Sequence, residues 1–490
     1  MAISFNSIPG NLRINFLAVE IDNTLANQGP AILPYRVLII GQKTSAGSQA
    51  VNTIAQVTSA SQVSSLAGRG SMLHRMASKY FANNAFTETY IGVLADDDAG
   101  VAAVGTITVT ATTAQAGTIS LYIGGQLVTV GVATGDAQNT VAASINAAIN
   151  NNGDLGVTST VSTNVVTVTH RHKGLVGNDF DMRANYQRGE ALPTGVSLAF
   201  VQLTGGTTAP VLSGLIAALG DLWTQIIIMP YTDATSLTAI ETELASRFAP
   251  TRMIDGVAIT AAEGTVGTLT TLGGARNSPH VSIHAQPGKN PVVPPDEFAA
   301  ATGAVIAMAG QADPARPFQT LSLAGVLPPA EIDLFTNAER NLLLFDGIST
   351  TKSQSVGSVT LDVAISTYQT NSTGASDESY LYLNTMLNLL YLRFSFRNRI
   401  LLNYPRHKLA NDGSRYGAGQ AVITPMIGKG EALSWFRDME ELGLVENFAS
   451  FKANVICERD VSNPNRLNWL LPPDLINQFI VGAAKLQFRL

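Results

Sequence analysis

The segment TQIIIMPY at residues 224–231 begins a series whose pattern indicates the fold of this 490-residue chain. A nearly continuous apolar run of this length is typical of a strand buried on both faces. The segments that follow it alternate between helical and strand-like patterns, at 236–248, 252–260, 263–274 and 280–285. Strands that alternate with helices predict a mainly parallel sheet covered by helices on both faces.

The same alternation continues on either side of this series. Upstream, YRVLIIGQ at 35–42 and TETYIGVLA at 87–95 are strand patterns with a helical pattern between them. Downstream, the helix expected at 294–311 begins with prolines and acidic residues, as helix N-termini commonly do. We therefore predict one α/β domain formed by residues 30–98 and 206–350.

Between the two halves of this domain, the composition changes to Thr, Val and Gly. Residues 99–205 contain several alternating runs, and the pair Gly124-Gly125 between two of them is a hairpin signal. One helical pattern, at 139–152, interrupts the strands. We expect a β-rich domain inserted at a surface loop of the α/β domain, because surface loops tolerate insertions best.

The remainder of the chain is predicted to form an α+β domain over residues 351–478. A strand pattern at 359–370 precedes a long helical pattern at 377–402 that is apolar on nearly every face. We expect Ser376 to cap that helix. Residues 1–29 and 479–490 are expected to form extended arms.

Both ends of the chain alternate like strands. The apolar positions of these patterns are Ile3, Phe5, Leu12, Ile14 and Phe16 at one end and Leu486, Phe488 and Leu490 at the other. A half-apolar strand with an open edge can template further pairing. Each end is therefore expected either to pair within its own subunit or to complete a sheet of a neighbouring copy.

The composition limits the classes of function. Charged residues make up only 13% of the chain, below the roughly 25% typical of soluble domains, which suggests that copies of the chain cover much of its surface. A net charge of −6 without a Lys/Arg-rich block argues against nucleic-acid binding. The N-terminus lacks a signal-peptide pattern, and polar residues interrupt the most apolar window, 211–231. We expect neither secretory export nor membrane insertion.

Few residues are arranged for chemistry. Ser71, in GRGSML at 68–73, is at an expected helix start, where an N-cap role is the simplest interpretation. His280 and His284 flank an expected strand, without the acidic or Cys neighbours that a metal site needs. The lone Cys457 is expected to be a buried small hydrophobe, and no phosphate-binding loop follows a strand. We predict no catalytic, metal or cofactor site.

Two further polar motifs are interpreted as solvated surface. His170-Arg171-His172 is expected at a hairpin end. The run Asp96-Asp97-Asp98 is expected at the junction of the inserted domain, since it lacks the spaced oxygen ligands of a calcium loop.

Three later segments resemble the tail sheath proteins of Mu-like contractile-tailed bacteriophages. They are FTNAERNLLLFDGIST at 335–350, YPRHKLANDG at 404–413 and the closing run at 463–490. The resemblance implies that the α/β domain is doubly wound and subtilisin-like. A subtilisin serine follows its Asp and His along the chain, whereas Ser71 precedes nearly every candidate partner, so catalysis is not expected.

The resemblance also implies a mechanical function. Proteins of this family stack as six-subunit rings around a rigid tail tube and contract when the baseplate is triggered, which drives the tube through the host envelope. The implied partners are further copies of the chain, the tail tube protein, and the baseplate and tail terminator proteins, with no direct binding to nucleic acid and no membrane insertion. The implied location is the virion tail, after assembly in the host cytoplasm.

The resemblance places the C-terminal domain innermost, facing the tube, and the inserted domain outermost. Candidate tube contacts are Arg393, Arg397, Arg399, Arg406 and Lys408. Alternatively, these cations complement a helix dipole. The two arms are expected to join the C-terminal sheet of neighbouring subunits.

Three other functions are left open by the sequence. The chain could be the sheath of a phage-derived bacteriocin or another contractile injection system. A hydrolase on a subtilisin-like fold is disfavoured by the residue order. A surface adhesin is suggested only by the Thr-rich insertion.

Overall fold

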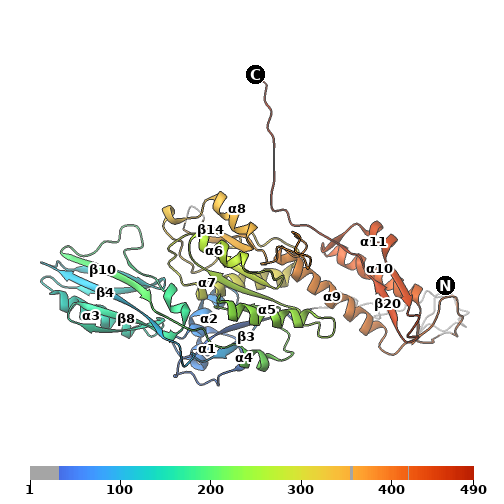
Figure 1. Cartoon of the computed structure of the whole chain (residues 1–490), viewed down its shortest axis with the longest axis horizontal. Helices are drawn as coiled ribbons and strands as arrows, with labels where there is room; N and C mark the ends of the chain where they lie inside the picture. The colour runs from blue at the N-terminus through green and yellow to red at the C-terminus, as the bar shows by residue number, and fades with distance from the viewer. Residues whose placement is uncertain (1–32, 354–356, 418, 490) are drawn as a thin grey trace, which may run out of the picture. The chain divides into compact units, whose positions relative to one another are not determined.

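The structure is a computed structural model that describes residues 33–353, 357–417 and 419–489 (Figure 1). Contacts divide the chain into two compact units. Unit 1 contains Arg393–Leu442 and Asn447–Pro473, whereas unit 2 contains Pro34–Leu392, Gly443–Glu446 and the residues from Asp474 onward. No helix in the described ranges is long and apolar enough to cross a membrane.

Unit 2 is built on an eight-stranded sheet. Its strands are β1 (Arg36–Gln42), β2 (Thr53–Val57), β3 (Glu88–Leu94), β11 (Ile226–Ile228), β12 (Val257–Ala262), β13 (Val281–Ala285), β14 (Ile348–Ser353) and β15 (Val359–Val363). They lie in the order β15-β14-β13-β12-β11-β1-β3-β2. The six strands from β14 to β3 are parallel, and the edge strands β15 and β2 are antiparallel to their neighbours. The predicted mainly parallel sheet is therefore confirmed.

Helices pack against this sheet and against each other. Those of unit 2 outside the inserted region are α1 (Ala60–Ala67), α2 (Met72–Asn83), α4 (Ser213–Leu219), α5 (Ala234–Phe248), α6 (Val266–Gly274), α7 (Pro295–Ala312) and α8 (Asn337–Phe345), with a 3-10 turn η2 (Glu331–Asp333). Helix α7 contacts β11, β12 and α2. It approaches the sheet closely because Gly303 has no side chain; a Cβ there would lie 2.5 Å from Cγ1 of Ile228.

The region between β3 and α4 forms two smaller sheets around a core of its own. Its elements are β4 (Ala102–Ala111), β5 (Gly117–Ile123), β6 (Gln126–Val132), α3 (Gln138–Asn151), β7 (Val157–Ser162), β8 (Val165–Lys173), η1 (Leu175–Asp179), β9 (Met182–Ala184) and β10 (Val196–Thr204). The sheet orders are β10-β4-β8-β7 and β6-β5-β9. Gly124 and Gly125, with φ of 54° and 76°, form the predicted two-residue hairpin turn between β5 and β6.

Unit 1 is a small α+β assembly. It contains the second half of α9 (Leu383–Asn403), β16 (Lys408–Leu409), β17 (Val422–Ile423), α10 (Pro425–Glu441), α11 (Phe448–Asn454), β19 (Ile456–Arg459) and β20 (Leu467–Leu470). Aromatic side chains form its core: Phe436 stacks on Phe451 at 4.2 Å, and Phe396 meets the edge of Trp435 at 5.3 Å. Gly443, with φ of 71°, follows the C-cap Leu442 of α10 as a left-handed residue, which is common just after a helix end.

Two expected boundaries differ from the structure. Strand β14 continues past residue 350 and pairs with β15, so the sheet extends beyond the predicted limit of the α/β domain. Helix α9 begins at Leu383, so Ser376 is not its N-cap. The preceding segment is held in another conformation, since Ser376 bridges Thr370 and the Tyr368 hydroxyl donates to the Asp377 carboxylate at 2.6 Å.

Candidate functional site

The first candidate interaction surface is the two-stranded ribbon of β19 and β20 in unit 1. Cys457 and Trp469 pair across it and face α10, where a Cβ on Gly428 would lie 2.7 Å from the Cys457 Sγ. The neighbouring pair, Ile456 and Leu470, alternates to the opposite face and is 50% and 57% exposed. Among the described strands, none pairs with the ribbon beyond β19 and β20 themselves.

Cys457 itself differs from the expectation of a buried hydrophobe. The residue is only half-buried. Burial, followed by the charge of Asp412, raises the pKa of its thiol to about 11. The neutral thiol thus serves as a packing group of the ribbon.

The second candidate is the C-terminal segment. It follows β21 (Asp474–Leu475), which pairs with β18 (Val445–Glu446) in unit 2, and residues 476–489 form no strand (Figure 1). Leu486 and Phe488 are 91% and 78% exposed. The other predicted exchange positions lie outside the described residues: Ile3, Phe5, Leu12, Ile14, Phe16 and Leu490. Strand exchange at these positions stays a prediction.

The predicted cationic cluster separates into different environments. Arg399 joins α9 to α10, because its guanidinium lies 2.7 Å from Glu431 Oε2 and 2.6 Å from Asp438 Oδ2. Arg397 and Arg406 are exposed, as is Lys408, whose Nζ donates to Gln420 at 2.8 Å, whereas Arg393 is half-buried. The last turn of α9 has no basic residue, so these cations do not complement its C-terminal dipole within that turn.

The expectation of a solvated hairpin end at His170 and His172 is wrong. Both side chains alternate inward along β8 and are nearly completely buried. The His172 Nδ1–H donates to Asp96 at 2.8 Å, and its Nε2 accepts from the Met72 backbone N–H at 3.0 Å. These bonds join the inserted region to the start of α2. Burial lowers the pKa of His170 to about 3, so that imidazole is neutral.

Ser71 is the N-cap of α2, as predicted. Its buried Oγ accepts from the His74 backbone N–H at 3.2 Å. The His74 ring points elsewhere, since its Nδ1 accepts from the Gly70 N–H at 3.1 Å. The described geometry therefore places the Ser71 hydroxyl in a helix cap, away from the neighbouring imidazole base.

The other histidine pair is also part of the core. His280 and His284 are both buried, at the start of β13 and within it. The His284 Nε2 lies 3.0 Å from the Ser282 Oγ, and burial lowers the pKa of His284 to about 3. Within the described ranges, no group of three or more His, Cys, Asp or Glu residues is arranged to hold a metal ion.

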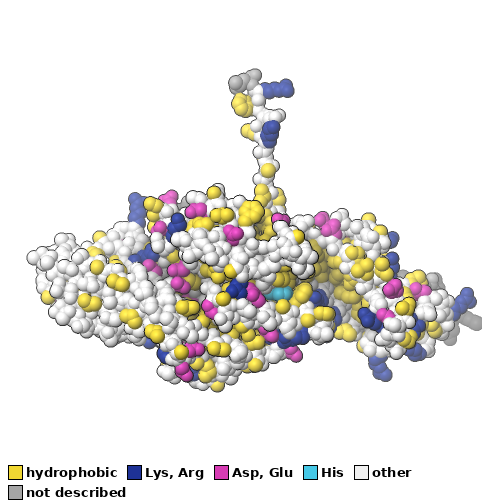
Figure 2. Space-filling model, viewed as in Figure 1, with side chains coloured by type: hydrophobic (Ala, Val, Ile, Leu, Met, Phe, Trp, Pro, Cys, Tyr) yellow, Lys and Arg dark blue, Asp and Glu magenta, His cyan; other side chains and the backbone are white. Residues whose placement is uncertain are grey.

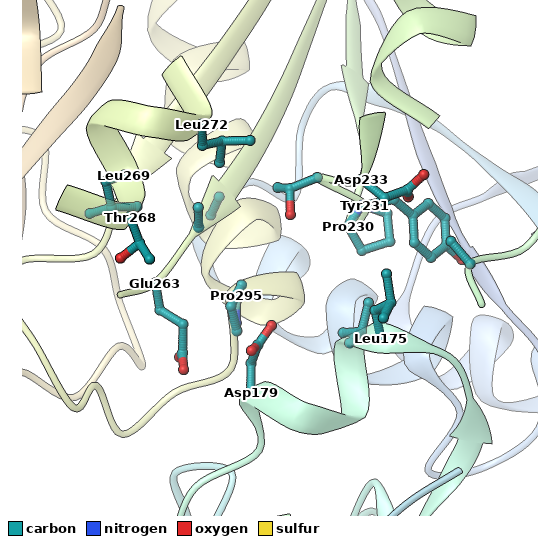
Figure 3. A pocket seen from close by; sticks show the side chains of 15 residues that line it. Leu175, Asp179, Pro230, Tyr231, Asp233, Glu263, Thr268, Leu269, Leu272 and Pro295 are labelled. Carbon is teal, nitrogen blue, oxygen red and sulfur yellow. The ribbon is translucent and has the colours of Figure 1, made fainter. Parts of the chain in front are cut away.

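A pocket of about 250 Å³ lies at the carboxyl ends of β11 and β12 (Figure 3). Asp233 comes from the loop after β11, Glu263 follows β12, and Asp179 comes from η1 of the inserted region. Burial, and then the charges of Asp179 and Asp181, raise the pKa of Glu263 to about 9, and burial raises that of Asp179 to about 6. The Glu263 carboxyl group in this pocket therefore keeps its proton at neutral pH.

Sequence reasoning missed this pocket because its carboxyl groups come from distant segments. The available signal was positional, since Glu263 directly follows one buried parallel strand and Asp233 lies five residues after another. Ligands of open α/β sheets usually bind at that edge.

Comparison with known proteins identifies the family. A model described as the phage tail sheath protein central domain matches residues 205–367, and one described as the phage tail sheath C-terminal domain matches residues 375–489. The Mu-like prophage FluMu tail sheath protein of Haemophilus influenzae is 39% identical over 490 residues, covering 100% of both chains. The chain belongs to the phage tail sheath protein family.

Solved sheath structures resemble this tail sheath chain at low identity. A sheath tail protein from Listeria innocua is 12% identical with a TM-score of 0.49, covering 92% of this chain and 94% of that one. The contracted helical sheath of the anti-feeding prophage is 10% identical with a TM-score of 0.48, covering 98% and 99%. The family assignment rests on the sequence matches. The C-terminal tail sheath model extends to residue 489, and so includes the extended segment after β21.

Proposed function

We propose that this chain is the sheath subunit of a contractile phage tail. Subunits polymerise as six-subunit rings stacked around the tail tube, and the sheath contracts to drive the tube through the host envelope. The observation that carries this mechanism is a pair of features in one subunit: a ribbon that no other described strand extends, and an extended tail with exposed alternating apolar residues. Such features are the two halves of a strand-addition contact.

The tail of one subunit adds to the β19–β20 ribbon of another. Each added strand contributes several backbone hydrogen bonds, worth about 0.5–1.5 kcal/mol apiece. The N-terminal arm is proposed to add in the same way. A strand on an extended tether keeps subunits linked while their rigid contacts change, which a contracting lattice requires.

The energy for contraction is stored when the lattice assembles. Two packings of one sequence can differ by only a few kcal/mol and still be switchable. A small difference per subunit becomes large when the subunits switch in one wave. The chain acts mechanically in this scheme and not as an enzyme.

The proposed surroundings follow from the same scheme. The exposed cations Arg397, Arg406 and Lys408 contact the tail tube, while baseplate and terminator proteins bind the two ends of the sheath. The protein resides in the virion tail after assembly in the host cytoplasm.

We further propose that the central sheet is doubly wound and subtilisin-like. The strand order supports this, because β1 lies between β11 and β3, and successive strands are added on both sides of it. Residues 99–205 then form an outer inserted domain, and the chain after the central sheet forms the inner domain.

The function is tested by electron microscopy of the full chain expressed alone. Hollow tubes or six-fold rings are expected from the wild type, and none from a chain lacking Lys485–Leu490. Leu486→Asp/Phe488→Asp should act like the deletion, whereas Gln487→Asp, on the polar face, should not. Circular dichroism checks that each variant is folded. Tubes formed by the truncated chain would contradict the proposal.

A further inference from the structure

The chain is held on unit 2 before its C-terminal segment extends into solvent. Strand β21 pairs with β18, and the Ile476 N–H then donates to the Leu444 carbonyl at 3.3 Å. The Gln478 side chain donates to the Ala315 carbonyl at 3.3 Å. One residue later, the Phe479 carbonyl accepts from Gln319 Nε2 at 3.2 Å. Ile476 is thus tied to the turn after α10, and residues 478–479 are tied to the segment after α7.

The next two residues lie at a pocket of about 430 Å³ in the same unit, which both apolar and polar side chains line. Ile480 and Val481 line it together with Phe345 of α8 and with Ile365. Figure 2 shows hydrophobic side chains gathered where the segment leaves the surface, with hydrophobic and basic side chains along its projecting part.

Exposure alternates along this stretch. Ile476, Gln478 and Ile480 are half-buried, whereas Asn477, Phe479 and Val481 are exposed. From Gly482 to Arg489 every residue is exposed. The alternation shows which face of the stretch contacts unit 2, and it ends abruptly at a glycine, the residue with the greatest backbone freedom.

We propose that residues 476–481 are a positioning strap that fixes the point from which the C-terminal strand departs and thereby limits which neighbouring subunit it can reach. This inference rests on the proposed function. An extended chain spans at most about 3.5 Å per residue. The segment from Gly482 to Arg489 therefore reaches about 28 Å, whereas a segment loose from Ile476 onward would reach about 49 Å.

The shorter tether also strengthens the contact. The effective concentration of a tethered group falls roughly as the −3/2 power of tether length, so releasing the strap lowers it about twofold for each exchanged tail. Each subunit gives one tail and receives another. The strap residues are therefore positioning residues: they act through the strand that Leu486 and Phe488 provide.

The first test is photo-crosslinking in the full-length, unassembled protein. A benzophenone amino acid at position 480 should crosslink within one chain to residues 341–345 or 363–382, and the same probe at the outward position 477 should not. Equal crosslinking at the two positions, or none at 480, would overturn the strap.

The second test measures the protein concentration at which tubes form. Ile480→Asp should raise this concentration several-fold, because the new carboxylate loses the apolar contacts of Ile480 and faces the carboxylates of Asp377 and Glu378 in the same pocket. Asn477→Asp adds the same charge on the outward face and should leave the concentration for tube formation unchanged. The conservative variant Ile480→Leu should assemble like the wild type. Thermal unfolding confirms that the variants are folded. Wild-type assembly by Ile480→Asp would refute a positioning role. Tubes from the chain lacking Lys485–Leu490 would instead refute strand donation, whatever the strap does.

Discussion

Arg75 Nη2 lies 2.7 Å from Asp296 Oδ2 in an ion pair that is wholly buried between α2 and α7. The same guanidinium reaches Glu297 at 2.8 Å through Nη1, and its carbon lies 4.9 Å from the centre of the Phe180 ring. One side chain thus holds two buried carboxyl groups of the central domain and contacts the inserted region. Burial raises the pKa of Asp296, and the charge of Arg75 opposes that shift by favouring the ionised carboxyl.

Replacing Arg75 by leucine should destabilise the subunit by about 3–5 kcal/mol, because both carboxyl groups would remain buried without their partner. Urea denaturation at pH 7 measures the loss. Arg69→Leu is the matched control, since its bidentate pair with Asp154 is largely exposed and should hardly affect stability. If the two variants unfolded at the same urea concentration, the buried pair would not have the role assigned to it.

The Glu263 pocket predicts a pH dependence of stability. A carboxyl whose pKa in the folded state is raised, here from 4.5 to about 9, stabilises the fold fully below pH 4.5 and loses that contribution as the pH rises toward 9. Glu263→Gln cannot lose a proton and should become more stable than the wild type as the pH rises. Unfolding at pH 5 and pH 8.5 measures the difference between the two chains, with the exposed Glu331→Gln as control. A constant difference across this range would contradict the pKa shift.

Two glycines of α10 predict opposite effects on unit 1. A Cβ at Gly428 would clash with Cys457 and Trp469, so Gly428→Ala should cost about 1–3 kcal/mol and displace the ribbon. Gly430 has open space around its Cβ position, so Gly430→Ala should stabilise the helix by up to about 1 kcal/mol. Chemical unfolding monitored by tryptophan fluorescence measures the stability of the two variants. Equal stabilisation by both alanines would show that the ribbon does not pack on α10 as described.

The central sheet could be predicted because its strands are apolar on both faces, as Ile226, Ile227 and Ile228 illustrate. The same reasoning missed the burial of His170 and His172, although they continue the inward alternation of Val166 and Val168 along β8. The motif was interpreted from its polarity when its period was the better guide.

Other features depend on contacts that no local pattern reports. Arg75 and Asp296 are 221 residues apart, so their pairing follows only from the packing of α2 on α7. The strap at 476–481 likewise depends on Ala315 and Gln319. The terminal alternation at Leu486 and Phe488 was visible in the sequence, but the attachment of residues 476–481 to unit 2 was not.

The cations of unit 1 predict a separation between stability and tube binding. Arg399 donates to Glu431 and Asp438, so Arg399→Met should lower the stability of unit 1 by removing the cation that the two carboxylates share. The triple variant Arg397→Ser/Arg406→Ser/Lys408→Ser removes exposed charge and should leave stability nearly unchanged. It should weaken binding of purified tail tubes, most strongly at low salt, because exposed charges are screened as ionic strength rises. Co-sedimentation at two salt concentrations and thermal unfolding measure the two effects. Undiminished tube binding by the triple variant would remove these residues from the tube-facing surface.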